Sequence, residues 1–379
     1  MSSKRSAIST FADAKPVAYV DLKAQFAEDR DDILATVERV FAEGNFILGD
    51  TVEAFEQALS KQFGFDHVVA LNSGTDALLL ALLALGVRRG DEVITQSNSF
   101  VASASAIVHV GAKPVFVDVK PDQCLDPEKL EAAVTPRTRA IMPVHLTGRV
   151  CDMPAIQAVA DRHGLVVIED AAQAIGSMLM DKAAGAWGDA AAFSLHPLKN
   201  LNAAGDAGFL TTKRADVADR VRLLRNHGLV DRNTVVEFGL NSRLDTLQAA
   251  LLLRRLSSLE EVTRKRRDNA ARYRALLDPK YVFHPPCRQE EFNTFHTFVV
   301  QVDRRDELQA FLKERGIGSA IHYPIPIHLQ PAARDLDCKP GELPVTERQV
   351  GRILSLPIHQ FLTEADIEQV ARTVNGFFR

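Results

Sequence analysis

One lysine of this 379-residue chain lies in a setting that suggests covalent chemistry. Lys199 is part of the stretch FSLHPLKNLNAAGDAG (residues 193–208), between an apolar run and a glycine-rich loop that leads into another apolar run. In a largely desolvated site the pKa of a lysine amine falls, and the amine becomes a nucleophile able to form a Schiff base. Ser194 adds a hydroxyl group at the same predicted strand end. A lone loop lysine is usually solvated, so this interpretation depends on other motifs.

A second motif predicts an anion site. The run HVVAL ends at Leu71, and the residues NSGT turn the chain into the apolar helix that follows. Free N–H groups and the helix dipole at such a start attract an anion, typically a phosphate. The alternative is a plain helix N-cap formed by Ser73 or Thr75. The motif is not a Walker A loop, because no GK[ST] follows it.

A third motif supplies carboxylates. Glu169 and Asp170 end the strongly apolar strand GLVVIED, and the alternation of side chains along a strand sends them to opposite faces. One of the two can therefore point into a site and pair with a protonated ring nitrogen, while capping of a following helix, DAAQAIG, is the alternative role. An anion cradle, a ring-nitrogen partner and an imine-forming amine are together the requirements of pyridoxal 5'-phosphate (PLP).

Composition bounds the class of protein. With 46% apolar and 25% charged residues the chain is typical of globular proteins, and its length predicts two domains. A net charge of −4 gives no reason to expect a nucleic acid or an anionic membrane as partner. The four cysteines (Cys124, Cys151, Cys287 and Cys338) form no CxxC pair, so we expect reduced thiols and no metal site. Neither a signal peptide nor a membrane span is apparent, which predicts a cytoplasmic protein.

The elements that position the motifs alternate between strand and helix. Strand-like runs are HVVAL (67–71), DEVITQ (91–96), KPVFVDV (113–119), RAIMPVHL (139–146), LVVIED (165–170), AAAFSL (190–195) and GFLTT (208–212). Helical candidates between them cover residues 75–86, 99–110, 127–134 and 153–163. This order predicts an α/β domain with a mostly parallel sheet between helices. The three motifs then lie at the carboxyl ends of strands, where such sheets bind ligands.

A long, charged helical stretch from Leu247 predicts the passage to a second domain. We expect a disordered lead-in over residues 1–17, a large domain over 18–255 and a small α+β domain over 256–379. The small domain should contain a strand at 294–302, a helix beginning at Asp306 and a final helix near 364–378.

The sequence resembles the DegT/DnrJ/EryC1/StrS family of sugar aminotransferases, from about Tyr19 to the C-terminus. The matching phrases are YVDL, FILGDTVEAFE, NSGTDAL, GDEVI, HLTGRVCDM, EDAAQAIGS, FSLHPLKNL, GLNSRLDTLQAA, HYPIPIHLQPA and LSLPIH. The resemblance implies the aspartate-aminotransferase-like fold of type I PLP enzymes.

The resemblance also implies roles for individual residues. Lys199 matches the lysine that binds PLP covalently and transfers the proton. Asp170 matches the acid that keeps the pyridine nitrogen protonated. Gly74, Thr75 and Ser194 match groups that contact the cofactor phosphate.

Further matches concern the ring and the substrate. Gln173 fits the position beside the ring or its 3-hydroxyl, and Phe100, which would otherwise be ordinary core, fits the aromatic residue stacked on the pyridine. Asn241 matches the asparagine that reaches the phosphate from the neighbouring subunit, which implies a homodimer with shared active sites; a helix N-cap is its alternative role. Arg243 is expected either to bind a substrate carboxylate or to hold the interface. His322 and Tyr323 are expected near the sugar pocket.

The implied activity is transamination from L-glutamate to a nucleotide-diphosphate-linked 3- or 4-keto-deoxyhexose, through the pyridoxamine phosphate form of the cofactor. A cyclitol ketone is an alternative acceptor, and a non-catalytic regulator of the same fold is an alternative function. Family members that dehydrate their sugar carry histidine at the lysine position, so Lys199 favours transamination. A nicotinamide dehydrogenase is excluded because no GxGxxG follows the first strand.

Overall fold

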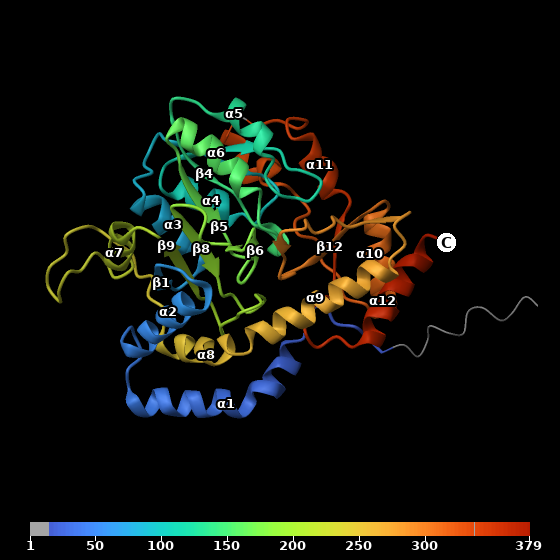
Figure 1. Cartoon of the computed structure of the whole chain (residues 1–379), viewed down its shortest axis with the longest axis horizontal. Helices are drawn as coiled ribbons and strands as arrows, with labels where there is room; N and C mark the ends of the chain where they lie inside the picture. Colours follow the sequence, from blue (N-terminus) through green and yellow to red (C-terminus); the bar gives the residue numbers. More distant parts are fainter. Residues whose placement is uncertain (1–14, 337) are drawn as a thin grey trace, which may run out of the picture.

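The chain forms a large and a small domain joined by a helical segment that runs along one side of the molecule (Figure 1). The computed structural model describes residues 15–336 and 338–379. Of the predicted lead-in over residues 1–17, residues 1–14 lie outside the described part of the chain. Val17 differs from that expectation, because it is 3% exposed and forms a β-bridge with Ile317 of the small domain.

A seven-stranded sheet in the order β1-β9-β8-β5-β4-β2-β3 forms the centre of the large domain. Its strands are β1 (His67–Leu71), β2 (Glu92–Gln96), β3 (Lys113–Val117), β4 (Thr138–Met142), β5 (Val166–Asp170), β8 (Ala190–Ser194) and β9 (Gly208–Thr212). All seven come from the predicted runs. Only β9 runs against its neighbours, so the carboxyl ends of β1, β5 and β8 meet at one edge. The mostly parallel α/β architecture is thereby confirmed.

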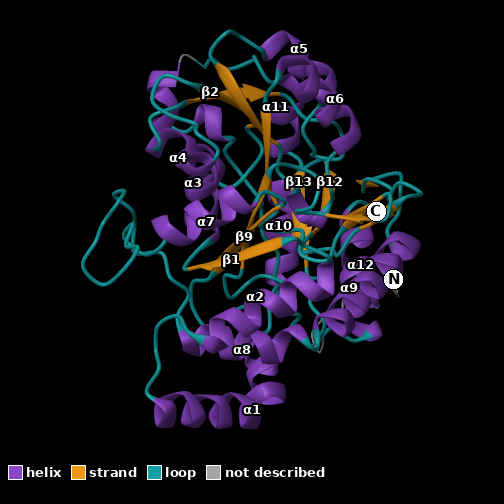
Figure 2. Cartoon of the chain, turned by 60° about the vertical axis from the view of Figure 1, so that its left-hand side comes forward, coloured by secondary structure: helices purple, strands orange, loops and turns teal. Residues whose placement is uncertain are grey.

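Helices cover both faces of this sheet, which explains why most residues of its strands are buried on both faces (Figure 2). One face packs against α3 (Gly74–Ala84), α4 (Ala102–His109) and α7 (Ala215–Leu224). The other packs against α2 (Asp50–Phe63), α5 (Leu130–Ala133), α6 (Met153–His163) and α8 (Thr246–Leu256). A further helix, α1 (Leu22–Glu43), lies against α8.

The long helical stretch after Leu247 is two helices and not one. α8 ends at Leu256 and packs on the large domain, whereas α9 (Leu259–Leu276) packs on α12 (Glu364–Phe377) of the small domain. Two serines separate the helices, and the Ser257 hydroxyl donates to the carbonyl of Arg254 at 2.7 Å. Serine side chains that bond the backbone in this way compete with helix continuation. The chain passes between the domains at this break.

The small domain consists of a three-stranded sheet with helices against it. The sheet order is β10-β12-β13, and the elements are β10 (Val282–Phe283), β12 (Phe298–Val302), β13 (Ile353–Leu356), α10 (Arg305–Glu314) and α12. One segment of this part of the chain packs back on the large domain. α11 (Pro344–Val350) is held by Asp118, whose carboxylate accepts from the amides of Val345 and Thr346 at 2.8 Å each.

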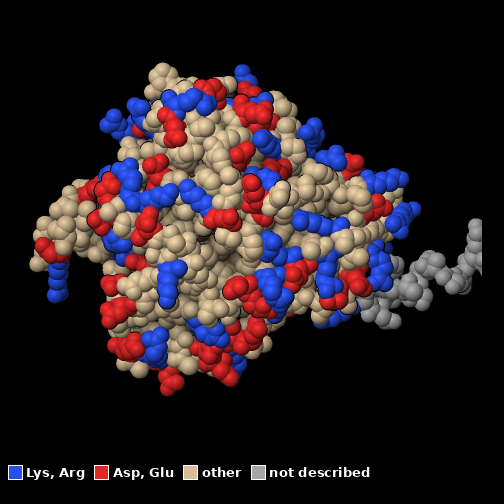
Figure 3. Space-filling view, viewed as in Figure 1, with Lys and Arg blue, Asp and Glu red and all other residues tan. Residues whose placement is uncertain are grey.

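Charge is mixed over the surface face drawn in Figure 3. On the face drawn in Figure 3, basic and acidic side chains of the described residues are mixed, without a continuous area of one sign. Among the described residues, no helix combines the length and the apolar character needed to cross a membrane. All four cysteines are free thiols.

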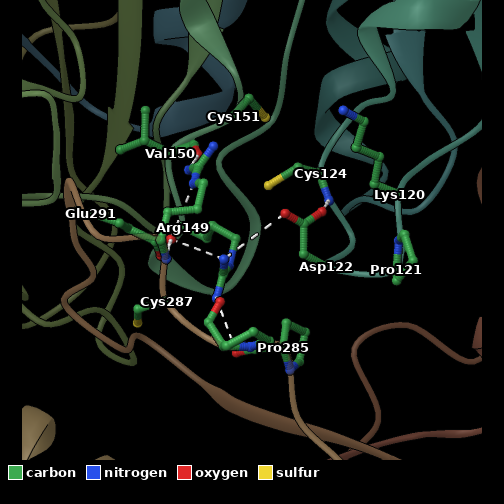
Figure 4. A network of polar contacts seen from close by, with 12 residues as sticks. Lys120, Pro121, Asp122, Cys124, Arg149, Val150, Cys151, Pro285, Cys287 and Glu291 are labelled. Carbon is green, nitrogen blue, oxygen red and sulfur yellow. Dashed lines mark hydrogen bonds and ion pairs between the residues drawn. The ribbon is translucent and has the colours of Figure 1, made fainter.

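Arg149 ties the segment after β10 to the large domain through a buried ion pair (Figure 4). It follows β4, is 3% exposed, and donates from Nη1 at 2.9 Å to Glu291, the first residue of β11 (Glu291–Phe292), which pairs with β6 (Met178–Leu179). Its Nη2 donates to the carbonyl groups of Pro285 and Pro286 at 3.2 and 3.1 Å. Because both charges are desolvated, Arg149 depends on Glu291 for compensation, while Glu291 is also approached by Nε of Arg288 at 3.3 Å. These contacts fix the segment after β10 against the end of β4.

We expect Glu291→Gln to lower the free energy of unfolding by about 3 kcal/mol, because it leaves the buried guanidinium of Arg149 without its main counter-charge. Chemical denaturation measures the effect. The exposed neighbour serves as control, since Glu290→Gln should change stability by less than about 0.5 kcal/mol. The double variant Arg149→Met/Glu291→Met should recover stability relative to Glu291→Gln. Equal losses in the Glu290 and Glu291 variants would show that the buried ion pair does not contribute to stability.

Candidate functional site

A cavity of about 470 Å³ lies where the carboxyl ends of the central strands face the small domain. Nine of the eleven residues predicted for the site line it: Gly74, Thr75, Phe100, Asp170, Gln173, Ser194, Lys199, His322 and Tyr323. Asn241 and Arg243 do not. Asp170 lies at the end of β5, and the loop with Lys199 follows β8. The first turn of α3 lies beside them, and residues of the small domain form the opposite wall of the cavity.

The first turn of α3 forms the part of the cavity suited to an anion. Ser73 caps the helix by accepting from the amide of Asp76 at 3.1 Å, so the predicted N-cap coexists with a possible anion site. A Cβ atom on Gly74 would lie 2.7 Å from Cβ of Ser194, and one on Gly208 would lie 2.4 Å from the carbonyl carbon of Ser73. Only glycine permits this approach of three backbone segments. Helix N–H groups and the exposed Thr75 therefore face the cavity at close range.

Asp170 and Glu169 point to opposite faces, as the strand alternation predicts. Asp170 is 5% exposed and accepts from the Ser103 hydroxyl at 2.7 Å and from the amide of Ala172 at 3.2 Å. Burial raises the pKa of Asp170, against the effects of Ser103, Ala172 and the positive charge of Lys199. A protonated ring nitrogen placed beside it would offset the cost of burial.

The segment after Asp170 differs from the sequence prediction. Residues 171–176 form turns, not the predicted helix DAAQAIG, and Gly176 has a φ of 76°, a left-handed conformation that ends any helical run. Glu169, on the far side of the sheet, is fully buried and accepts from the amides of Gly185 and Gly188 at 2.8 and 2.7 Å. Its role is to anchor the loop that precedes β8.

The loop that carries Lys199 is tied to both domains. The amide of Lys199 donates to the carbonyl of His196 at 2.8 Å, and the side chain of Asn200 donates to the carbonyl of Thr294 at 3.0 Å. Burial lowers the pKa of the Lys199 amine to about 8, although the carboxylate of Asp170 acts in the opposite direction. An appreciable fraction of this amine is therefore neutral and nucleophilic near neutral pH.

Phe100, Gln173 and Tyr323 border the space between the lysine and the acid. Oε1 of Gln173 accepts from the amide of Thr147 at 2.7 Å, and its Nε2 lies 3.5 Å from the Tyr323 hydroxyl. The ring of Phe100 is 53% exposed and its centroid is 5.7 Å from that of Tyr323. An aromatic ring with a free face beside a cavity can stack on a planar ligand.

His322 presents a neutral imidazole to the cavity. Burial and the charge of Lys199 lower the pKa of His322 to about 4. Its Nδ1 is 2.9 Å from the Ser355 hydroxyl, which leaves Nε2 free to contact a ligand. Burial likewise raises the pKa of Tyr323, so its hydroxyl stays protonated.

Asn241 and Arg243 lie together on the surface, away from the cavity of their own chain. Asn241 is exposed, and its Oδ1 accepts from Nε of Arg243 at 3.1 Å. Nη1 of Arg243 donates to Asn226 at 3.1 Å. Neither residue lines the cavity of its own chain.

Some residues at the site were not predicted from sequence, notably Tyr19, Arg266 and His296, which line the cavity, and Ser103, which bonds Asp170. Tyr19 belongs to a phrase that carries the family resemblance, which was the one available signal. The others come from helices and loops without a local motif, and only packing brings them to the cavity.

We expect the amine of Lys199 in the cofactor-free protein to react with an acylating reagent with a midpoint near pH 8, because the neutral form that predominates above its pKa is the nucleophile. Asp170→Asn should move the midpoint to lower pH, since the carboxylate stabilises the ammonium form. Mass spectrometry of labelled peptides over a pH series measures both, and the exposed Lys61 in the same spectra corrects for the reagent. Identical midpoints in the wild-type and Asp170→Asn proteins would contradict the electrostatic coupling.

Comparison with known proteins agrees with the geometry. A sequence profile of the DegT/DnrJ/EryC1/StrS aminotransferase family matches residues 27–375. A "pleiotropic regulatory protein" of Geobacillus stearothermophilus is 42% identical over 96% of this chain and 99% of its own. A dTDP-3-amino-3,4,6-trideoxy-alpha-D-glucose transaminase of Streptomyces venezuelae is 42% identical over 93% of each chain.

Solved structures are similar as well. The S. venezuelae protein DesV, crystallised in complex with a ketimine intermediate, superimposes with a TM-score of 0.93 at 41% identity, over 96% of this chain and 99% of its own. NtdA of Bacillus subtilis, with bound cofactor PMP, gives 0.86 at 36% identity, over 92% and 81%. Profile, relatives and structures agree over nearly the whole length, and the chain belongs to the DegT/DnrJ/EryC1/StrS aminotransferase family.

Proposed function

We propose that this protein uses PLP to transfer an amino group from an amino acid, L-glutamate, to a keto-sugar carried on a nucleoside diphosphate. The observation that carries the proposal is the convergence on one cavity of an amine with a lowered pKa, a buried carboxylate and a helix N-terminus. The amine can form an imine with the aldehyde of PLP, the carboxylate can pair with its ring nitrogen, and the helix N-terminus can bind its phosphate.

The residues present fit this cofactor. A phosphate fits at Gly74, Thr75 and Ser194, which line the cavity at the first turn of α3, where only a glycine at position 74 lets the helix start approach Ser194 so closely. The protonated ring nitrogen fits against Asp170. When bound, the cofactor supplies an electron sink for negative charge that develops at the carbon bearing the amino group. The PMP bound to NtdA supports the same assignment.

In this proposal Lys199 holds and moves the proton. Its Nζ takes a proton from the α-carbon of the amino acid in the first half of the reaction. In the second half it delivers a proton to the sugar carbon that receives the amino group. Both transfers require a pKa near the working pH. Asp170 keeps a proton on the ring nitrogen, and Ser103 orients the carboxylate through their 2.7 Å hydrogen bond. Phe100 and Gln173 restrain the plane of the ring.

The acceptor is proposed from relatives and from the cavity. The S. venezuelae relative is named for a dTDP-linked amino sugar, and a Pseudomonas aeruginosa relative, 40% identical, for a UDP-linked 3-oxo-glucuronate. A cavity of about 470 Å³ with neutral polar groups at His322 and Tyr323 suits a hexose. A cyclitol ketone is the alternative acceptor. A purely regulatory role is disfavoured, although one relative is named as a regulator, because Lys199, Asp170 and the residues proposed to bind the phosphate all line one cavity.

We also propose a homodimer in which each subunit completes the site of the other. The segment between α7 and α8 extends from the large domain (Figure 1) and exposes Val230, Val236 and Phe238, the last 98% exposed. Asn241 and Arg243 belong to the same segment, shortly before α8 begins. Apolar side chains at such exposure favour a protein interface. A cytoplasmic location is consistent with the free thiols.

We expect Lys199→Ala to abolish the visible absorbance of the covalent link to PLP. We also expect the cofactor to separate from this variant during gel filtration. The reason is that this variant lacks the proposed attachment atom. The exposed Lys61→Ala is the matched control and should retain colour and cofactor. An unchanged absorbance band in Lys199→Ala would refute the assignment.

We expect subunit complementation between two inactive variants, Lys199→Ala and Asn241→Ala. A mixed dimer contains one site with an intact lysine and an intact asparagine from the partner. Random exchange of subunits makes about half the dimers mixed, so about one quarter of wild-type activity should return. Activity after mixing and dilution measures it. If no activity returns although mixed dimers are demonstrated by mass spectrometry, the sites are not shared.

A further inference from the structure

Arg266 is a buried cation in the cavity without a counter-charge. It lies on α9, is 7% exposed and lines the cavity. Its Nη1 donates to the carbonyl groups of Phe295 and His296 at 3.2 and 3.1 Å, while its buried Nε has no partner. Among the described residues only Tyr19 favours its charge, and burial lowers the pKa of Arg266 to about 10. A guanidinium in this setting is costly unless a ligand supplies an anion.

The other basic groups that line the cavity near Arg266 are not fixed charges. The pKa of His296 is well below its usual range because of burial and the positive charges of Lys199 and Arg266. His322 is neutral for similar reasons, and Lys199 gives up its charge when it acts as a nucleophile. No other arginine of the described part of the chain lines the cavity. An anion bound on this side therefore depends on Arg266.

The position of Arg266 selects among the anions that the proposed reaction brings. The cofactor phosphate has its own cradle at the first turn of α3. Arg266 and Lys199 also line a second, smaller cavity together. The positive charges of both lower the pKa of His296, so both lie near this side chain. An anion here lies next to the group that moves the proton. In an amino acid the α-carboxylate is bonded directly to the carbon that loses the proton, whereas the diphosphate of a sugar nucleotide is separated from the keto carbon by several bonds.

We infer that Arg266 binds the α-carboxylate of the amino donor and thereby orients the α-hydrogen toward Lys199. This inference rests on the proposed transamination and assigns a donor subsite within it. Nε of Arg266 has no hydrogen-bond partner. Nε and Nη2 lie on one edge of the guanidinium, and two parallel N–H donors on such an edge bind a carboxylate in a bidentate manner. Tyr19 and the neutral His296 border the same subsite.

The test compares L-glutamate with L-isoglutamine, in which the α-carboxylate is an amide. The PLP-loaded protein is mixed with each compound and the absorbance of the bound cofactor is followed in single turnovers. In the wild type, L-glutamate should half-saturate at a concentration about 10- to 100-fold lower than L-isoglutamine, the ratio expected for charge-assisted hydrogen bonds. Arg266→Gln should raise the value for L-glutamate by that factor and leave the value for L-isoglutamine unchanged.

Controls separate this inference from folding and from the proposed function. Arg267→Gln is the matched control, because Arg267 is the next residue of the helix and its guanidinium lies 4.0 Å from the ring centroid of Phe292; it should behave as wild type. Affinity for α-methyl-L-glutamate, which lacks the transferable hydrogen, gives a readout independent of turnover. Arg266→Lys retains a charge and should recover part of the preference for glutamate if Arg266→Gln folds poorly.

Two outcomes overturn the inference while leaving the proposed function intact. The first is a wild-type protein that uses L-isoglutamine as well as L-glutamate, whatever the variants do. The second is an Arg266→Gln variant in which both donors weaken equally, or in which the half-saturating concentration of the keto-sugar nucleotide rises instead. If no amino acid changes the absorbance of the wild-type protein, it is the proposed transamination that fails.

Discussion

Exclusion of water lowers the pKa of a lysine amine and makes it a better nucleophile, and the burial of Lys199 depends on much of the architecture. Lys199 follows β8 at the edge of the sheet, a position that the large domain alone would leave open to solvent. The small domain supplies the opposing wall through His296, His322 and Tyr323. Desolvation by both domains lowers the pKa of Lys199 to about 8, and the carboxylate of Asp170 limits the shift.

The two domains must therefore keep a constant relative orientation, and the contacts between them are polar and specific. Arg149 pairs with Glu291, Asp118 caps α11, and Asn200 bonds the carbonyl of Thr294 beside the lysine loop. Buried hydrogen bonds and ion pairs of this kind have strict geometry, so they fix orientation more than they add net stability. The break between α8 and α9 lets the chain cross from one domain to the other without disturbing these contacts.

Local signals in the sequence were sufficient where a residue and its chemistry lie in one short segment. The apolar runs became the strands of the central sheet, the glycine-rich turn became the start of α3, and alternation along β5 separated Glu169 from Asp170. They were misleading where tertiary contacts compete with local preference. The turn after Asp170 resembles a helix in sequence, and the serine pair after α8 interrupts what otherwise appears as one amphipathic helix.

By itself the sequence determined the strands of the central sheet and predicted the reactive groups, because strand periodicity, glycine placement and ordered motifs are local properties of the chain. Only the tertiary structure decided which groups share the cavity. Arg266 and His296 come from segments without a motif, about seventy and a hundred residues beyond the lysine, and their burial is what makes one an uncompensated cation and the other a neutral base. The charge state of a side chain depends on its solvation and neighbours, and these exist only once the domains have packed.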